Sequence, residues 1–182
     1  MIRVRRRFIV LGVVLVVAAL VWRSCTSRAP APAVEPTASD STGAGMRAVT
    51  LWFASPEGDS LVAESREMPE RPGLHERVAA LVAALEQGPR EAGVRTLPEG
   101  TMLLHAYLDD AGLLTLDLSR PFRQGFYGGP RAEEMTLGSL VRTLAANVPE
   151  VKSIRIVCAG AALPTLGGHF PLDQPLDPDD WP

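Results

Sequence analysis

Residues 104–118 read LHAYLDDAGLLTLDL. Apolar residues occupy every second position in both halves of this stretch: Leu104, Ala106, Leu108 and then Leu114, Leu116, Leu118. A period of two is typical of a strand with one buried face. The four residues between the halves, Asp109-Asp110-Ala111-Gly112, are rich in turn formers. The stretch therefore predicts a β-hairpin whose apolar side chains share one face.

The segments on either side of the hairpin predict two helices, because their apolar residues recur at a spacing of three and four. Gly88-Pro89 ends the first pattern and Pro149 ends the second. The predicted buried stripes are Leu74, Val78, Leu81, Val82, Leu85 and Leu137, Leu140, Val141, Leu144, Val148.

Further strands are predicted before and after the helices. Residues 49–53 alternate as a strand does, residues 61–68 suit a second, more exposed strand, and Ile154, Ile156 and Cys158 point inward from a last one. The order β-(β)-α-β-β-α-β, with a short tail strand near residues 169–172, predicts an α+β fold with two helices on one face of a small mixed sheet. This domain is expected over residues 47–176, before an acidic, frayed tail over residues 177–182.

A basic cluster and an apolar run begin the sequence. Three arginines at positions 5–7 precede an unbroken apolar run over residues 8–22, and Arg23 follows it. Fifteen helical residues rise roughly 22 Å, against a hydrocarbon core of about 30 Å. We expect residues 1–23 to form one apolar helix, a single-pass signal-anchor in the bacterial cytoplasmic membrane. The basic cluster places the N-terminus in the cytoplasm and the domain outside.

Two other fates of this segment stay open. Signal peptidase could cleave after Ala31-Pro32-Ala33, although this site lies about ten residues beyond the apolar run. Cys25 could be lipidated, although Trp22-Arg23-Ser24 lacks the small residues expected before a lipidated cysteine. Either event would release the domain from its anchor to the outer side of the membrane.

Composition separates the anchor from the domain and excludes one class of partner. Residues 24–46 are mostly Ala, Pro, Ser, Thr and Gly, which predicts a disordered linker. Six of the 18 basic residues and none of the 21 acidic ones lie in residues 1–28, so the remainder carries about −9. An acidic body is repelled by phosphate backbones, so we expect no nucleic-acid partner.

The sequence contains no arrangement of residues that is typical of a catalytic or metal-binding site. His75, His105 and His169 have no metal-ligand spacing, and Cys158 is expected to be a small buried apolar residue. Ser119 with Asp117 and His105, the Gly138-Ser139 step, and Asp109-Asp110 are considered as catalytic groups and rejected, because none has the required local setting. We therefore predict no catalytic, cofactor-binding or metal-binding residue, and no enzyme.

One loop is singled out for binding. Gly125-Phe126-Tyr127-Gly128-Gly129 precedes the second helix, and glycines before a helix can cradle an anion. Glu133 and Glu134 in the first turn disfavour a phosphate there. The stretch is interpreted as a mobile loop whose Phe126 and Tyr127 could contact a partner.

The sequence from Val49 to Leu172 resembles a GerMN domain, the module of bacterial sporulation and germination proteins and of many envelope lipoproteins. The matching motifs are VTLWF at 49–53, LEQGP at 85–89, TLPEGT at 96–101, LDLS at 116–119, LVRTL at 140–144, PEV at 149–151 and LGGH at 166–169. The resemblance implies a compact α+β fold similar to ring-building motifs of envelope assemblies, outside the cytoplasmic membrane. It implies no catalytic residue and no cofactor.

These features lead to a hypothesis about function. A membrane segment at residues 8–22, a linker and a small domain without reactive groups favour a non-enzymatic scaffold or protein-interaction module. Cell-wall or sporulation-type assembly is the expected setting, with another envelope protein or a second copy as the partner. The alternative is an extracytoplasmic module that binds a small ligand or a wall fragment, including peptidoglycan, through the 125–129 loop and the sheet face. An enzyme acting on wall polymers is the least favoured class.

Overall fold

The structure is a computed structural model, and it describes residues 45–182. The predicted anchor and all but the last two residues of the predicted linker lie outside this range. Within residues 45–182, no helix combines the length and hydropathy needed to cross a bilayer. The elements are β1 (Met46–Ala54), β2 (Leu61–Pro69), α2 (Leu74–Gln87), β3 (Leu103–Leu108), β4 (Leu113–Leu118), α3 (Pro121–Gln124), α4 (Pro130–Asn147), β5 (Ser153–Cys158), β6 (Ala161–Ala162) and the 3₁₀ turn η1 (Pro178–Asp180).

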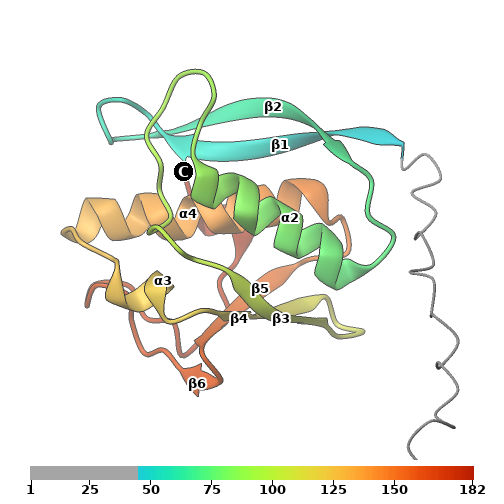
Figure 1. Cartoon of the computed structure of the whole chain (residues 1–182). Coiled ribbons are helices and arrows are strands. Elements are labelled where there is room, and N and C mark those ends of the chain that lie inside the picture. The colour runs from blue at the N-terminus through green and yellow to red at the C-terminus, as the bar shows by residue number, and fades with distance from the viewer. Residues whose placement is uncertain (1–44) are drawn as a thin grey trace, which may run out of the picture. The chain divides into compact units, whose positions relative to one another are not determined.

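Two sheets enclose the two long helices. Strands β1 and β2 form an antiparallel hairpin, and the second sheet has the order β3-β4-β5-β6 with β4 and β5 parallel. Figure 1 shows α2 and α4 between the hairpin and the four-stranded sheet. The predicted α+β fold with two main helices is confirmed, but the prediction of one sheet is wrong. The cause lies at the edge of β1, where side chains of α4 stand in place of a neighbouring strand.

Polar side chains of α4 bind the backbone of β1 at this edge. The Asn147 amide accepts from Thr50 N–H at 3.1 Å and donates to Thr50 C=O at 2.7 Å. Thr143 Oγ1 accepts from Trp52 N–H at 2.9 Å, and Ser139 Oγ donates to Trp52 C=O. Since a buried backbone group without a partner is costly, these bonds let β1 end a sheet inside the molecule.

The predicted core stripes are confirmed. The four stripe residues of α4 and Val148, which follows its last residue, are fully buried, as are Leu114, Leu116 and Leu118 of β4. The stripe of α2 is buried apart from Leu74, at the first turn, which is partly exposed. Gly88 then ends α2 with a φ of 88°, a conformation that glycine adopts without strain.

Strand β3 departs from the predicted alternation. Its pairing with β4 shifts between Leu103 and His105, so Leu104 is the extra residue of a β-bulge. Leu104 is 37% exposed, and Leu103 packs against the core instead. The predicted inward position of Leu104 is therefore wrong, while Ala106 and Leu108 do face the core.

The C-terminal residues differ from the prediction in two ways. Residues 169–172 form no strand, and the short strand after β5 is β6. Residues 177–182 are not frayed: the Trp181 side chain is 8% exposed and its ring lies 5.5 Å from that of Phe170. Gly138 of α4 leaves room for this contact, because a Cβ there would lie 3.4 Å from the Trp181 ring.

Candidate functional site

The loop singled out from the sequence lines a groove of about 660 Å³. The other walls are the β1–β2 turn at residues 56–58, the segment from Val94 to Pro98, and the first turns of α4. The Tyr127 side chain is 89% exposed, while Phe126 is half-buried against the core. The two aromatic residues thus have different roles, since Phe126 fixes the loop and Tyr127 is free to contact a partner.

Two acidic residues near the start of α4 have partners within the domain. Arg131 donates to Glu134 at 2.8 Å, one turn along α4. Glu133 turns away from solvent and is fully buried. Glu133 lies in the first turn of α4, as predicted, but its carboxylate binds the distant segment Leu166–Phe170, and Glu134 pairs with Arg131.

Glu133 anchors the segment Leu166–Phe170. Its carboxylate accepts hydrogen bonds from the backbone N–H groups of Leu166 at 3.1 Å and His169 at 3.0 Å, and lies 2.8 Å from His169 Nδ1. A Cβ on Gly167 would lie 2.6 Å from the Phe126 ring and 2.9 Å from this carboxylate. Gly167 is thus required by the close approach of the backbone to Glu133 and Phe126.

The environment of Glu133 lowers the pKa of its carboxyl group. Burial by itself raises the pKa of a carboxyl group, but the N–H groups of Gly167, His169 and Phe170 and the His169 ring hold the pKa of Glu133 below its ordinary value. Because the pKa of Glu133 is lower in the folded state than in the unfolded state, the ionised carboxylate stabilises the fold at pH values above the unfolded-state pKa. This stabilisation is lost as the pH falls through the folded-state pKa.

Glu133→Gln should therefore make the domain less sensitive to acid. At neutral pH the variant should be less stable by about 2 kcal/mol, because a charge-assisted acceptor of several N–H groups is replaced by a neutral amide. The difference should shrink as pH falls below about 4. Urea midpoints of both proteins between pH 7 and pH 3 measure this, and parallel curves would show that Glu133 does not titrate with unfolding.

The outer edge of β3 is the second candidate surface. β3 is the first strand of its sheet, so one side of its backbone has no neighbouring strand. Met102, Leu104 and Tyr107 are 60%, 37% and 68% exposed along it. We call residues 102–108, together with the side of β3 that has no neighbouring strand, the β3 edge; apart from His105 these residues contain no ionisable side chain that bears charge near neutral pH.

The open edge of β2 contrasts with the β3 edge. Strand β2 has the exposed Glu67 on its outer face, the charged residues Glu64 and Arg66 on its inward face, and Pro69 at its end. Charged residues and proline are the means by which proteins protect an edge from pairing with another chain. Of these two edges, β3 is therefore the one suited to accept a further strand.

The groups considered for catalysis have structural partners. Ser119 Oγ donates to Gly100 C=O at 3.1 Å and accepts from Met102 N–H at 2.9 Å. Asp117 accepts from Gly160 N–H, and His105 stands opposite it in the register without a bond to it. Ser139 lies inside α4 and binds Trp52 C=O and Thr96 Oγ1. The three serine, aspartate and histidine side chains therefore form no relay.

The remaining candidates are dispersed. His75 is exposed at the start of α2, His169 binds Glu133, and Asp109 accepts from the N–H groups of its own turn. Cys158 is buried, as predicted, with its thiol near Ser119 C=O. In the part of the chain that the structure describes, no three histidine, cysteine or acidic residues gather as a metal site.

Two charged residues that matter were not singled out in the sequence. Glu64 and Arg66 form a buried ion pair on β2, each side chain 4% exposed. Arg66 also donates to Gly88 C=O at 3.1 Å, and Glu64 accepts from Arg90 N–H at 2.8 Å. In the sequence, the feature that could have identified this pair is its spacing of two residues on a strand, which places both side chains on the same, inward face.

Comparison with known protein families identifies the family of this chain. A family model described as sporulation and spore germination, Germane, matches residues 50–164. No curated protein matches the chain.

Solved structures share the fold. A candidate lipoprotein from Clostridium perfringens is 23% identical with a TM-score of 0.53, over 75% of this chain and 90% of that one. The first GerMN domain of the sporulation protein GerM from Bacillus subtilis is 17% identical with a TM-score of 0.60, over 74% and 99%. The tandem GerMN domains of the same protein are 16% identical with a TM-score of 0.61, over 75% and 48%, as expected for one domain set against two. The chain belongs to the GerMN, or Germane, domain family.

Proposed function

We propose that this GerMN domain is a non-catalytic interaction module of the bacterial cell envelope that binds a partner protein by adding a strand at the β3 edge. The chain is tethered to the cytoplasmic membrane by residues 8–22, with the domain on the outer side. The partner is an extended, largely apolar segment of another envelope protein or of a second copy, in an assembly of the cell-wall or sporulation type.

The exposed, uncharged β3 edge is the observation that carries this proposal. An incoming strand would satisfy the free N–H and C=O groups of β3, and its side chains would cover Met102, Leu104 and Tyr107. Main-chain hydrogen bonds supply affinity in such complexes, and the side-chain contacts supply specificity.

The polar side chains elsewhere in the domain support a non-catalytic role. The hydroxyl groups of Ser119 and Ser139 and the carboxylates of Glu64 and Glu133 are all engaged in holding segments of the fold together. The names of similar proteins, a sporulation protein and a candidate lipoprotein, support the envelope as the setting.

The first test is photocrosslinking in cells, with a photoreactive residue in place of Tyr107 in the full chain. We expect a discrete adduct, whose mass identifies either a second copy or a different protein. The matched control places the same residue at Glu67, which is exposed on β2, and should give little adduct.

Two outcomes would contradict the proposal. Equal yields from the two strands would mean that the adduct reports exposure rather than binding. An adduct from a photoreactive residue in place of Tyr127, but not in place of Tyr107, would place the binding surface at the groove lined by residues 125–129. That result would favour a ligand-binding module.

A further inference from the structure

The open side of β3 carries a defined set of unpaired backbone groups. Asp109 N–H donates to Leu113 C=O at 3.2 Å, and Tyr107 lies two residues earlier in the same register with β4. Hydrogen-bonded pairs alternate with non-hydrogen-bonded pairs in an antiparallel ladder, so the backbone groups of Asp109 and Tyr107 face β4. The N–H and C=O groups of Ala106 and Leu108 therefore face away from β4, towards the open side.

Two features limit the length of this open stretch. The bulge at Leu104 interrupts the regular backbone on one side, and the turn that begins at Asp109 ends it on the other. An added strand thus meets regular, outward-facing groups at residues 106 and 108. The centre of the stretch is Tyr107, whose side chain is largely exposed.

A second copy of β3 fits this stretch in an antiparallel arrangement centred on Tyr107. Ala106 of each copy then lies opposite Leu108 of the other, so every outward N–H group meets an outward C=O group. Tyr107 lies opposite Tyr107 of the second copy in a non-hydrogen-bonded pair, where side chains approach most closely. The same register brings the turn at residues 110–112 of each copy beside the exposed Leu104 of the other.

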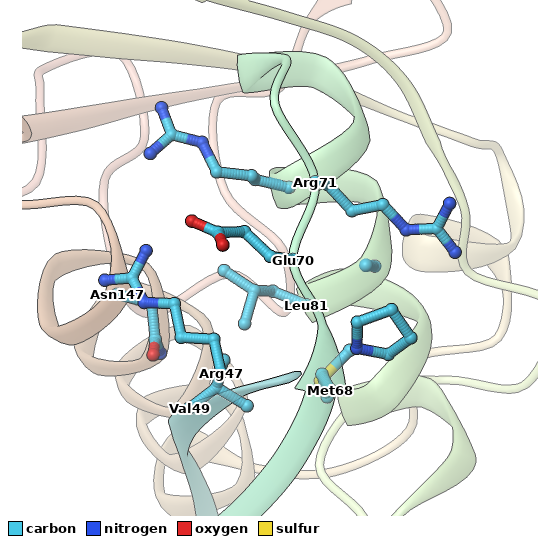
Figure 2. Close-up of a pocket in the computed structure, with 10 residues that line it drawn as sticks. Arg47, Val49, Met68, Glu70, Arg71, Leu81 and Asn147 are labelled. Carbon is cyan, nitrogen blue, oxygen red and sulfur yellow. The ribbon is translucent and has the colours of Figure 1, made fainter. Parts of the chain in front are cut away.

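Charge favours a second copy at β3 and disfavours it at the other sheet. A strand that pairs with itself can bring identical charges together, which is destabilising. In the β3 register, His105 lies opposite Asp109 of the second copy rather than opposite another histidine. At the end of β2, by contrast, Figure 2 shows Arg47, Glu70 and Arg71 around a pocket of about 30 Å³. That end is charged, and its pocket holds little more than a water molecule.

We propose that two copies of this domain associate through their β3 edges into one continuous sheet, in antiparallel register with Tyr107 opposite Tyr107. This inference rests on the proposed function and names its partner, a second copy of this chain. The contact is isologous, so it closes at two copies. Few residues take part, and a shared membrane strengthens such a weak contact because it raises the local concentration of the two copies.

Disulfide crosslinking in isolated membranes tests the register. All variants are full chains with Cys25→Ser, and Cys158 is buried. With a mild oxidant, Tyr107→Cys should form a disulfide-linked dimer, because the Cβ atoms of directly opposite residues lie about 4.5–5.5 Å apart. The matched control is His105→Cys on the same face. Its counterpart in the second copy is displaced along the strand by about 14 Å, so it should give at least about tenfold less dimer.

A charge exchange tests the same contact without a covalent bond. The measurement is energy transfer between labelled full chains in neutral detergent micelles. Tyr107→Glu and Tyr107→Lys should each weaken self-association about tenfold, because an aromatic pair is lost and like charges meet. A mixture of the two variants should associate at least about fivefold more tightly than either variant alone, since opposite charges then meet.

Three results would overturn self-pairing: no dimer from Tyr107→Cys, an equal yield from His105→Cys, or a mixture that associates no more tightly than its components. The photocrosslink at Tyr107 separates this inference from the proposed function. An adduct with a different protein alone would sink self-pairing and leave strand addition at the β3 edge intact. No adduct from Tyr107 at all would contradict the proposed function as well.

Discussion

Replacing Arg66 with methionine should destabilise the domain by about 3–5 kcal/mol, the range found when one partner of a buried ion pair is removed. Glu64 would stay buried without its guanidinium partner, and the C=O groups of Ala84 and Gly88 at the end of α2 would lose a donor. Burial raises the pKa of Glu64, and at present Arg66 and the N–H groups of Arg90 and Glu91 more than offset it. Urea unfolding followed by circular dichroism measures the loss.

The double variant Glu64→Gln/Arg66→Met is the matched control. A glutamine oxygen can still accept from Arg90 N–H, and no unpaired charge is left in the interior. The double variant should therefore recover a large part of the stability lost in Arg66→Met. A double variant as unstable as the single one would show that the loss comes not from the unpaired charge of Glu64 but from the other contacts of Arg66, which are its bonds to Ala84 and Gly88 C=O and its packing on Phe53, whose ring lies 5.9 Å away.

Asn147→Leu should cost about 2–4 kcal/mol, because it leaves both backbone groups of Thr50 without partners. Asn147 is 6% exposed, so water offers little replacement. Leucine keeps the branched shape and the number of heavy atoms, so no cavity is created and the loss of hydrogen bonds is tested. Chemical unfolding of the variant measures the effect.

Thr143→Val serves as the comparison for Asn147→Leu. It removes a single acceptor, the one for Trp52 N–H, and should cost about 1–2 kcal/mol. If both variants were as stable as the parent, the attachment of β1 to α4 would depend on apolar packing rather than on these side chains.

The helices and the core were predictable because their signal is local and repeated. Each helix has five apolar residues at helical spacing, and glycine or proline marks its end. Strands β4 and β5 alternate over their whole length, so one buried face follows directly from the sequence. The bulge at Leu104 was not predictable. Leu103 and Leu104 are the same residue type, so the alternation does not indicate which of the two faces the core.

The division into two sheets depends on contacts far apart in the sequence. Thr50 and Asn147 are 97 residues apart, and the alternation of β1 says nothing about what lies at its edge. Thr143 and Asn147 are polar residues on a helix, which by composition alone suit a solvated face. The burial of Glu133 was not predicted for the same reason, because the loop that buries it lies more than thirty residues away.

The candidate surfaces were only partly predictable. Tyr127 was expected to be available to a partner, and the structure exposes it. The β3 edge follows from the strand order, which the sequence does not contain, together with the outward turn of Leu104 at the bulge.

Amide hydrogen exchange over Leu103–Leu108 tests the central claim, the addition of a strand at the β3 edge, most directly. The full chain is measured alone and in complex with the partner captured from Tyr107. Strand addition predicts that outward-facing amides of β3 exchange at least about tenfold more slowly in the complex, because new backbone hydrogen bonds must open first. Exchange over β2 should not change. Unchanged exchange over β3 in a complex that has formed would contradict the account.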